Sequence, residues 1–141
     1  METQIRDRRH GGCQCGGVRY ELTGEPVVLS VCHCLECQKQ SASAFGMTQR
    51  VRREDFHLVS GEPRYWSRPT DSGGTTQCAF CPDCGSRVWH QAAPDSPLVS
   101  IKAGSLDVPV DFGSAMHIWT KRKLHGVIIP PGSVQFPEQP S

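Results

Sequence analysis

Cysteine is the residue type through which this chain is best suited to chemistry. Its 141 residues include eight cysteines in three short clusters. In chain order these are Cys13 and Cys15, then Cys32, Cys34 and Cys37, then Cys78, Cys81 and Cys84. Thiolates at such close spacing serve as zinc ligands, redox pairs or reactive nucleophiles. Eight thiolates are also the number that two all-cysteine tetrahedral zinc sites require.

The cellular compartment decides between disulfides and metal sites. The N-terminal stretch METQIRDRRHGGC lacks the apolar segment of a secretory signal, so we expect a cytoplasmic protein. Cysteines in a reducing compartment favour metal binding or catalysis over four disulfides. No βαβ pattern surrounds any cysteine pair, which disfavours a thioredoxin-like redox motif. The clusters therefore predict two bound zinc ions.

The last cluster contains CPDCG, a turn suited to two zinc ligands. Pro82 restricts one φ angle and Gly85 permits a positive one, so the sulfurs on either side can converge. Such a turn supplies two ligands and needs a distant partner. The stretch CQCGG is the natural partner, because its two glycines allow close backbone packing. We therefore predict a closed structural zinc site formed by Cys13, Cys15, Cys81 and Cys84.

The middle cluster predicts a second zinc site of a different kind. Cys32, Cys34 and Cys37 can occupy one face of the ion, and three protein ligands with a vacant corner are typical of a catalytic zinc. The fourth corner could hold water, substrate, His33 or Cys78. His33 lies between two ligands, so its side chain should point away from their metal. Cys78 is a candidate fourth ligand, a buried free thiol or a catalytic nucleophile.

Short β-branched and apolar stretches between turn residues predict an all-β fold of folded sheets or a small barrel. The predicted strands cover residues 18–22, 27–32, 44–51, 56–61, 63–67, 86–91, 97–104 and 116–121, with one helical turn at 34–41. Residues 68–76 predict an exposed loop, since nearly all are turn formers. We interpret 1–141 as a single zinc-binding domain with a flexible leader at 1–11 and a proline-rich tail at 130–141.

Charge and hydropathy argue against two classes of partner. The net charge is +1 with a pI near 7.6, whereas nucleic-acid binders carry a basic stripe. No apolar run approaches the length of a membrane span. We therefore expect neither nucleic acid nor membrane as a partner. Edge strands in a small β domain can pair between two copies of the chain, so a homodimer is possible, although no motif requires one.

The order of four motifs resembles a known family. These motifs are GGCQCGGVRYEL, CHCLECQKQSASAFG, FCPDCGSRVWH and IKAGSLD. They are similar to those of the glutathione-dependent formaldehyde-activating enzyme family, in the centromere protein V superfamily, over roughly residues 11–120. The resemblance implies a β-tent fold with two zinc sites. It assigns the structural zinc to Cys13, Cys15, Cys81 and Cys84 and the catalytic zinc to Cys32, Cys34 and Cys37.

The resemblance also implies a zinc-dependent enzyme of the carbon–sulfur lyase type. The namesake reaction joins glutathione and formaldehyde into S-hydroxymethylglutathione, so the expected partners are a small thiol and a small aldehyde. Glutathione is anionic, and Lys39, Lys102 and Arg50 are candidates to pair with its carboxylates. Beyond the metal ligands, no catalytic side chain is predicted.

Two hypotheses from other classes compete with the enzyme. The first is a zinc-stabilised binding module without catalysis, in which both sites are closed and Cys78 is the eighth ligand. The second is a redox sensor, in which Cys78 or a metal-free middle cluster is oxidised. Whether Cys78 ligates metal separates the enzyme from the binding module.

Overall fold

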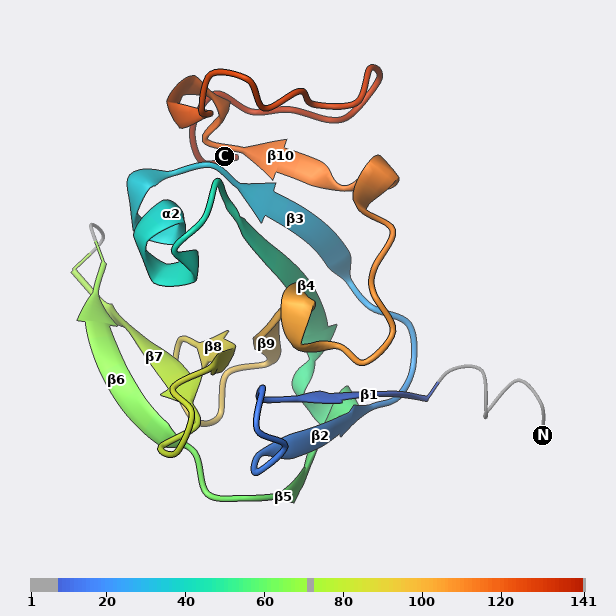
Figure 1. Cartoon of the computed structure of the whole chain (residues 1–141), viewed down its shortest axis with the longest axis vertical. Helices are drawn as coiled ribbons and strands as arrows, with labels where there is room; N and C mark the ends of the chain where they lie inside the picture. Colours follow the sequence, from blue (N-terminus) through green and yellow to red (C-terminus); the bar gives the residue numbers. More distant parts are fainter. Residues whose placement is uncertain (1–7, 71–72, 141) are drawn as a thin grey trace.

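Two β-sheets form the fold in the computed structural model, which describes residues 8–70 and 73–140 (Figure 1). The strands are β1 Arg9–Gly12, β2 Arg19–Leu22, β3 Val28–Cys32, β4 Gly46–Arg52, β5 Phe56–Ser60, β6 Arg64–Pro69, β7 Thr75–Phe80, β8 Arg87–Gln91, β9 Leu98–Lys102 and β10 Met116–Ile118. The α-helix is α2 Leu35–Ser41, and short 3-10 helices lie at Arg53–Asp55, Ala103–Ser105, Phe112–Ser114 and Thr120–Arg122. No helix in the described ranges has the length and apolarity to cross a membrane. The all-β prediction is confirmed.

The strand order decides which segments lie side by side. β1, β2 and β5 form a three-stranded antiparallel sheet, and the larger sheet has the order β10-β3-β4-β9-β8-β7-β6. Neighbours in the larger sheet are antiparallel except β10, which runs parallel to β3. Figure 1 shows the small sheet at the base of the view and α2 beside β3 and β4.

The hydrophobic core lies between the two sheets. Tyr20 of β2 is fully buried in it, together with Val99 and Ile101 of β9. Side chains alternate between the two faces of a strand, so Ser100 and Lys102 of the same strand point to the opposite face of the large sheet. Burying each large apolar side chain in this core contributes about 1.5–3 kcal/mol to stability.

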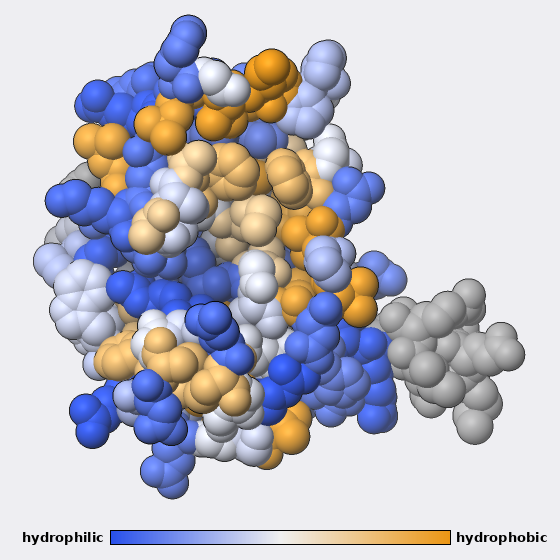
Figure 2. Space-filling model, viewed as in Figure 1, coloured by the Kyte–Doolittle hydropathy of each residue, from blue (hydrophilic) through white to orange (hydrophobic). Residues whose placement is uncertain are grey.

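The opposite face of the large sheet is polar. Lys102 has Thr48 as its cross-strand neighbour, and Cys78 has His90. Residues paired across neighbouring strands share a face, so these side chains point the same way as Ser100. Figure 2 shows hydrophilic residues gathered between α2 and β8 in this view. The sheet thus separates an apolar core from a polar surface that carries ionisable groups.

Two segment predictions need correction. Residues 1–7 of the predicted leader lie outside the described residues, but 9–12 form β1 because they pair in register with β2. The loop predicted at 68–76 is shorter than expected, and β7 was not predicted at all. Its residues pair with both β6 and β8, and cross-strand hydrogen bonding overrides the turn preference of the local sequence.

The proline-rich tail lies along β10. Phe136 N donates to the His117 carbonyl oxygen at 2.9 Å, and His117 N donates to the Val134 carbonyl oxygen at 2.9 Å. Gln135 forms an isolated parallel bridge with the same strand. The tail therefore covers the edge of the large sheet that β10 would otherwise expose.

Candidate metal centres

Four thiols from two distant loops converge at one point. Cys13 and Cys15 lie between β1 and β2, and Cys81 and Cys84 lie between β7 and β8. Their Sγ atoms all lie within 4.8 Å of one another. The structure thus brings together the four residues that the spacing predicted for a structural zinc. We call these residues the four-cysteine cluster.

Backbone N–H groups point at the sulfurs of this cluster. Val18 N donates to Cys13 Sγ at 3.2 Å, and Asp83 N donates to Cys81 Sγ at 3.4 Å. Such bonds favour the thiolate over the thiol. Gly85 closes the second turn with a φ of 80° and donates its N–H to the Cys81 carbonyl oxygen at 2.9 Å. Its missing Cβ permits this left-handed backbone, as the CPDCG motif predicted.

The sulfur spacing fits a tetrahedral zinc site. Cys15 Sγ lies 3.6 Å from Cys13 Sγ and 3.7 Å from Cys81 Sγ. With Zn–S bonds of about 2.3 Å, a tetrahedron places its sulfurs about 3.8 Å apart. Hydrogen bonding to Ser86 lowers the pKa of Cys84 to about 5. All eight cysteines are free, and the four Sγ atoms of this cluster lie within 4.8 Å of one another, so the cluster is suited to a single zinc ion.

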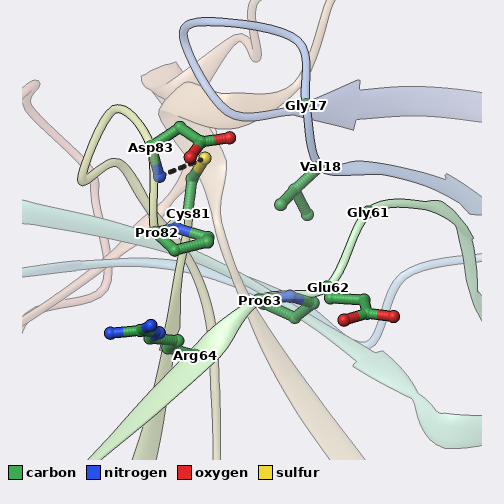
Figure 3. A pocket seen from close by; sticks show the side chains of 9 residues that line it. All are labelled: Gly17, Val18, Gly61, Glu62, Pro63, Arg64, Cys81, Pro82 and Asp83. Carbon is green, nitrogen blue, oxygen red and sulfur yellow. Dashed lines mark hydrogen bonds between the residues drawn. The ribbon is translucent and has the colours of Figure 1, made fainter.

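A pocket of about 490 Å³ borders the four-cysteine cluster (Figure 3). It is lined by Gly17, Val18, Gly61, Glu62, Pro63, Arg64, Cys81, Pro82 and Asp83. Figure 3 shows the charged side chains of Glu62, Arg64 and Asp83 pointing in different directions. A reaction site needs polar groups that converge on a ligand, and this pocket does not supply them.

The second group of thiols sits where β3 runs into α2. Cys32 ends β3, Cys34 is the N-cap of α2, and Cys37 lies in its first turn. Their Sγ atoms also lie within 4.8 Å of one another. Cys34 Sγ accepts a hydrogen bond from Cys37 N at 3.3 Å, so one side chain both caps the helix and joins the cluster. We call these residues the three-cysteine cluster.

The thiols of the three-cysteine cluster differ in pKa. Hydrogen bonding with Cys32 lowers the pKa of Cys37 to about 6, and the positive charges of Lys102 and Arg68 act in the same direction. The same interaction with Cys37, together with burial, raises the pKa of Cys32. Hydrogen bonding and the nearby positive charges therefore favour the thiolate form of Cys37, which is the form that binds a metal ion.

His33 does not join the thiols on either side of it. Its side chain is fully buried, and its Nε2 lies 2.9 Å from Nδ1 of His117. The two rings stack with centroids 5.2 Å apart. Burial lowers the pKa of His33 to about 4, so the ring is neutral at neutral pH. The structure places His33 in a buried histidine pair with His117 of β10.

Cys78 lies outside both groups of thiols. It is fully buried in β7, and its Sγ contacts the Thr76 carbonyl oxygen at 3.8 Å. Its cross-strand neighbours are Trp66 and His90. Burial raises the pKa of Cys78, which favours the neutral thiol. The role of fourth zinc ligand stays a prediction for Cys78.

A second pocket, of about 400 Å³, lies beside the three-cysteine cluster. It is lined by Gly12, Gln14, Gln40, Ser41, Ser43, Phe45, Gly46, Met47, Ser86, Arg87, Lys102, Gly104 and Ser105. Ser41 Oγ donates to the Cys37 carbonyl oxygen at 2.7 Å, and a Cβ built on Gly46 would lie 3.4 Å from Cys37 Sγ. The pocket and the cluster therefore share a wall. We call this cavity the Lys102 pocket.

Two cations line the Lys102 pocket. Of the three predicted partners for carboxylates, Lys102 reaches it, whereas Lys39 and Arg50 are exposed elsewhere. Arg87 also lines the pocket and donates to His90 Nε2 at 3.0 Å. Burial lowers the pKa of His90 to about 3, which keeps its ring a neutral acceptor. Sequence reasoning missed Arg87, because its meeting with Lys102 depends on the packing of neighbouring strands.

Family comparison assigns the chain. The sequence profile of the family described as "Glutathione-dependent formaldehyde-activating enzyme" matches residues 8–122. The chain belongs to this family. The match includes both cysteine clusters and every residue of the Lys102 pocket, so the features described above lie inside the family's region. A search of curated proteins finds no match.

A solved structure supports the fold of this family member. A structural-genomics crystal structure of a Rhodobacter sphaeroides protein is 20% identical, with a TM-score of 0.52. The alignment covers 90% of this chain and 98% of the other. At this identity the similarity concerns the fold alone, and function has to be argued from the site.

Proposed function

We propose that this chain is a zinc-dependent enzyme that adds a thiol such as glutathione to a small aldehyde, or catalyses the reverse carbon–sulfur cleavage. Membership of the family supports glutathione and formaldehyde as the type of substrate pair. The proposal includes two zinc ions, a structural one in the four-cysteine cluster and a catalytic one in the three-cysteine cluster. It places the reaction in the cytoplasm and leaves the homodimer as a prediction.

One observation carries this proposal: the three-cysteine cluster adjoins the Lys102 pocket. Three thiols, and not four, lie within 4.8 Å of one another there. A zinc ion with three protein ligands keeps a position for a further ligand, as catalytic zinc sites do. The neighbouring cavity of about 400 Å³ gives a small thiol and an aldehyde a place to meet.

Residues of the chain would hold the zinc ligands in place and give the neighbouring pocket a positive charge. A bound zinc ion supplies a Lewis acid that can hold a thiolate or polarise a carbonyl group. The hydrogen bond from Cys37 N to Cys34 Sγ ties the cluster to the first turn of α2. Lys102 and Arg87 make the adjoining wall of the pocket positive, which favours anionic substrates such as glutathione.

The binding-module alternative requires an eighth thiol ligand. Cys78 is the candidate, but its Sγ is directed at the Thr76 carbonyl oxygen and lies outside the group of three. The observation that favours the alternative is that the edge strand β6 exposes an aromatic side chain on each of its faces, since Tyr65 is 48% and Trp66 50% exposed. Zinc-stabilised surface recognition therefore stays the second candidate.

The variant Cys34→Ser tests the enzymatic proposal. Serine is a good N-cap, so α2 should persist while one thiolate is lost. We expect one zinc ion per chain in place of two, an unchanged circular dichroism spectrum, and loss of turnover of glutathione with formaldehyde. The control Glu36→Gln changes an exposed residue of the same helix and should retain both zinc ions and full turnover. Undiminished turnover in Cys34→Ser would refute the role of the three-cysteine cluster.

A further inference from the structure

Lys102 is a buried cation that has no carboxylate partner among the residues that the structure describes. The residue is 8% exposed. Within the described part of the chain its ammonium makes one hydrogen bond, a long one of 3.4 Å to Thr48 Oγ1. No described carboxylate lies within ion-pair distance of it. A buried ammonium without a carboxylate partner is costly, and the Cys37 thiol is the acidic group that lies near it. A negative charge that arrives with a ligand would stabilise the ammonium further.

Two arginines add positive charge to the same face of the sheet. Arg87 lines the Lys102 pocket, and its guanidinium lies 5.5 Å from the centroid of the Trp66 ring. Arg68 of β6 pairs with Thr76, two residues from the Trp66–Cys78 pair, so strand alternation places Arg68 on the same face of the sheet as Trp66, although it does not line the pocket. Neither arginine has an ion pair with a described carboxylate. Three cations therefore lie on a face of the sheet that contains thiols and, among residues 8–70 and 73–140, no carboxylate partner for them.

The ammonium also lies close to the proposed place of thiol chemistry. A Cβ built on Gly46 would be 3.4 Å from Cys37 Sγ and 3.7 Å from Lys102 Nζ. The sulfur and the ammonium thus flank the same small volume. A ligand that reaches both Lys102 and the three-cysteine cluster therefore needs only a few bonds between its anionic group and its reacting atom. Formaldehyde carries no charge, and the carboxylates of glutathione lie several bonds beyond its sulfur.

We propose that Lys102 and Arg87 form an anion subsite beside the three-cysteine cluster, with Arg68 adding positive charge on the same face of the sheet, and that the preferred aldehyde carries a carboxylate on its carbonyl carbon. The inference rests on the proposed thiol addition and narrows its second substrate to a short oxo acid. A carboxylate fits because it is small and planar, accepts charge-assisted hydrogen bonds from ammonium, and matches the fork of a guanidinium.

The reaction with such an oxo acid balances without an oxidant. The substrate thiolate sulfur forms a bond to the carbonyl carbon, and the π pair of the C=O bond moves to the oxygen. That oxygen takes up the proton that the thiol gave up, so the product is a hydroxy acid with sulfur on its hydroxyl-bearing carbon. Lys102 offsets the charge of the carboxylate, which would otherwise repel the approaching thiolate.

A matched pair of small thiols tests the subsite without turnover. Mercaptoacetate and 2-mercaptoethanol share a two-carbon thiol skeleton, and only the first carries a carboxylate. Isothermal titration calorimetry on the zinc-loaded protein should show mercaptoacetate binding at least about tenfold more tightly. Equal binding of the two thiols, or no binding of mercaptoacetate, would overturn the subsite.

Three variants locate the source of this preference. Lys102→Met keeps the length of the side chain and removes its charge, and it should reduce the ratio of the two dissociation constants to about one. Arg87→Met is the second pocket variant, needed if Lys102→Met does not fold, and should also reduce the ratio. Lys39→Met changes an exposed lysine of α2 outside the pocket and should leave the ratio unchanged. An unchanged preference in the folded pocket variants would overturn the assignment.

Turnover separates this inference from the proposed function. With glutathione as the thiol, glyoxylate should have a kcat/KM at least about tenfold above that of formaldehyde, and Lys102→Met should remove this advantage. If formaldehyde is the better substrate, the oxo-acid assignment is wrong while thiol addition stands. If neither aldehyde is consumed but mercaptoacetate is still preferred, the proposed function fails and the anion subsite stands.

Discussion

The two cysteine clusters share their side-chain chemistry but occupy different kinds of place in the fold. The four-cysteine cluster joins two loops, and Cys15 and Cys81, whose sulfurs are in contact, are 66 positions apart in the chain. The three-cysteine cluster comes from one short segment where β3 meets α2. A metal ion in the first would close a long loop of chain, whereas one in the second would order a local segment.

The surroundings of the clusters differ as well. Backbone N–H groups are the partners of Cys13 and Cys81 in the four-cysteine cluster. The three-cysteine cluster also has a backbone N–H partner, at Cys34, but it differs in the positive charge of Lys102 and Arg68 near it. Both clusters border a cavity, and only the one beside the three-cysteine cluster is lined by Lys102 and Arg87. The comparison teaches that the neighbours of a thiol cluster, rather than the ligand type, distinguish a structural site from one suited to reaction.

The largest expected effect is on the fold, from Cys81→Ser in the four-cysteine cluster. Structural zinc contributes roughly 10–16 kcal/mol of apparent binding free energy, which is comparable with the whole stability of a domain. We expect the variant to lose its cooperative thermal transition and the dispersion of its amide NMR spectrum.

The control for this experiment is Cys78→Ser, which replaces another fully buried cysteine of the same hairpin outside both clusters. It should remain folded. A folded Cys81→Ser protein with a cooperative transition and two zinc ions would remove the distinction between the clusters.

A smaller effect is expected from Gly46→Ala beside the three-cysteine cluster. The added Cβ would lie 3.2 Å from Cys37 Cβ, closer than ordinary contact, so Cys37 has to shift. We expect about a tenfold loss of turnover, equivalent to about 1.4 kcal/mol, with the fold retained. Gly104→Ala is the control, because this pocket glycine has nothing within 4 Å of its added Cβ. Equal turnover in both variants would contradict the tight packing of Cys37.

The pH dependence of stability tests whether the positive charges near the three-cysteine cluster keep His90 unprotonated in the folded protein. Burial, with the charges of Lys102, Arg87 and Arg68, lowers the pKa of His90 from 6.5 to about 3. Below pH 6.5 the unfolded chain therefore binds a proton that the folded protein does not, and stability falls as pH falls. The loss from His90 is at most about 1.4 kcal/mol per pH unit.

The variant His90→Gln should remove this part of the loss. Urea unfolding at pH 7, 6 and 5 should show a shallower decline than in the wild type. His57→Gln changes an exposed histidine of β5 and should follow the wild-type decline. Parallel curves for all three proteins would show that His90 titrates normally.

The smallest effect is expected from Cys78→Ser, which tests whether the two clusters bind zinc through different numbers of sulfur ligands. Zinc-edge X-ray absorption on Cys78→Ser should show the same sulfur coordination as the wild type, with a loss of about 1 kcal/mol in stability from the altered buried group. A change from four sulfurs to three at one site would mean that Cys78 closes the three-cysteine site. The binding-module hypothesis would then gain support.

Local sequence predicted the elements whose signals are local. The helical turn at α2 and all the strands except β1 and β7 were predicted from apolar or β-branched stretches between turn residues. β7 was missed because SGGTTQ, which leads into it, is typical of a loop, and its pairing with β6 and β8 comes from distant chain. β1 was missed because Gly11 and Gly12 weaken a strand pattern.

The sequence by itself determined the grouping of the cysteines, because C-x-C and C-x-x-C turns bring sulfurs together within a few residues and glycine permits their backbone. Only the tertiary structure decided what surrounds each group. Arg68, Arg87 and Lys102 lie on β6, β8 and β9, and each is an unremarkable strand residue in the sequence. Their meeting beside the three-cysteine cluster depends on strand order and register, which are set by long-range packing of the whole sheet.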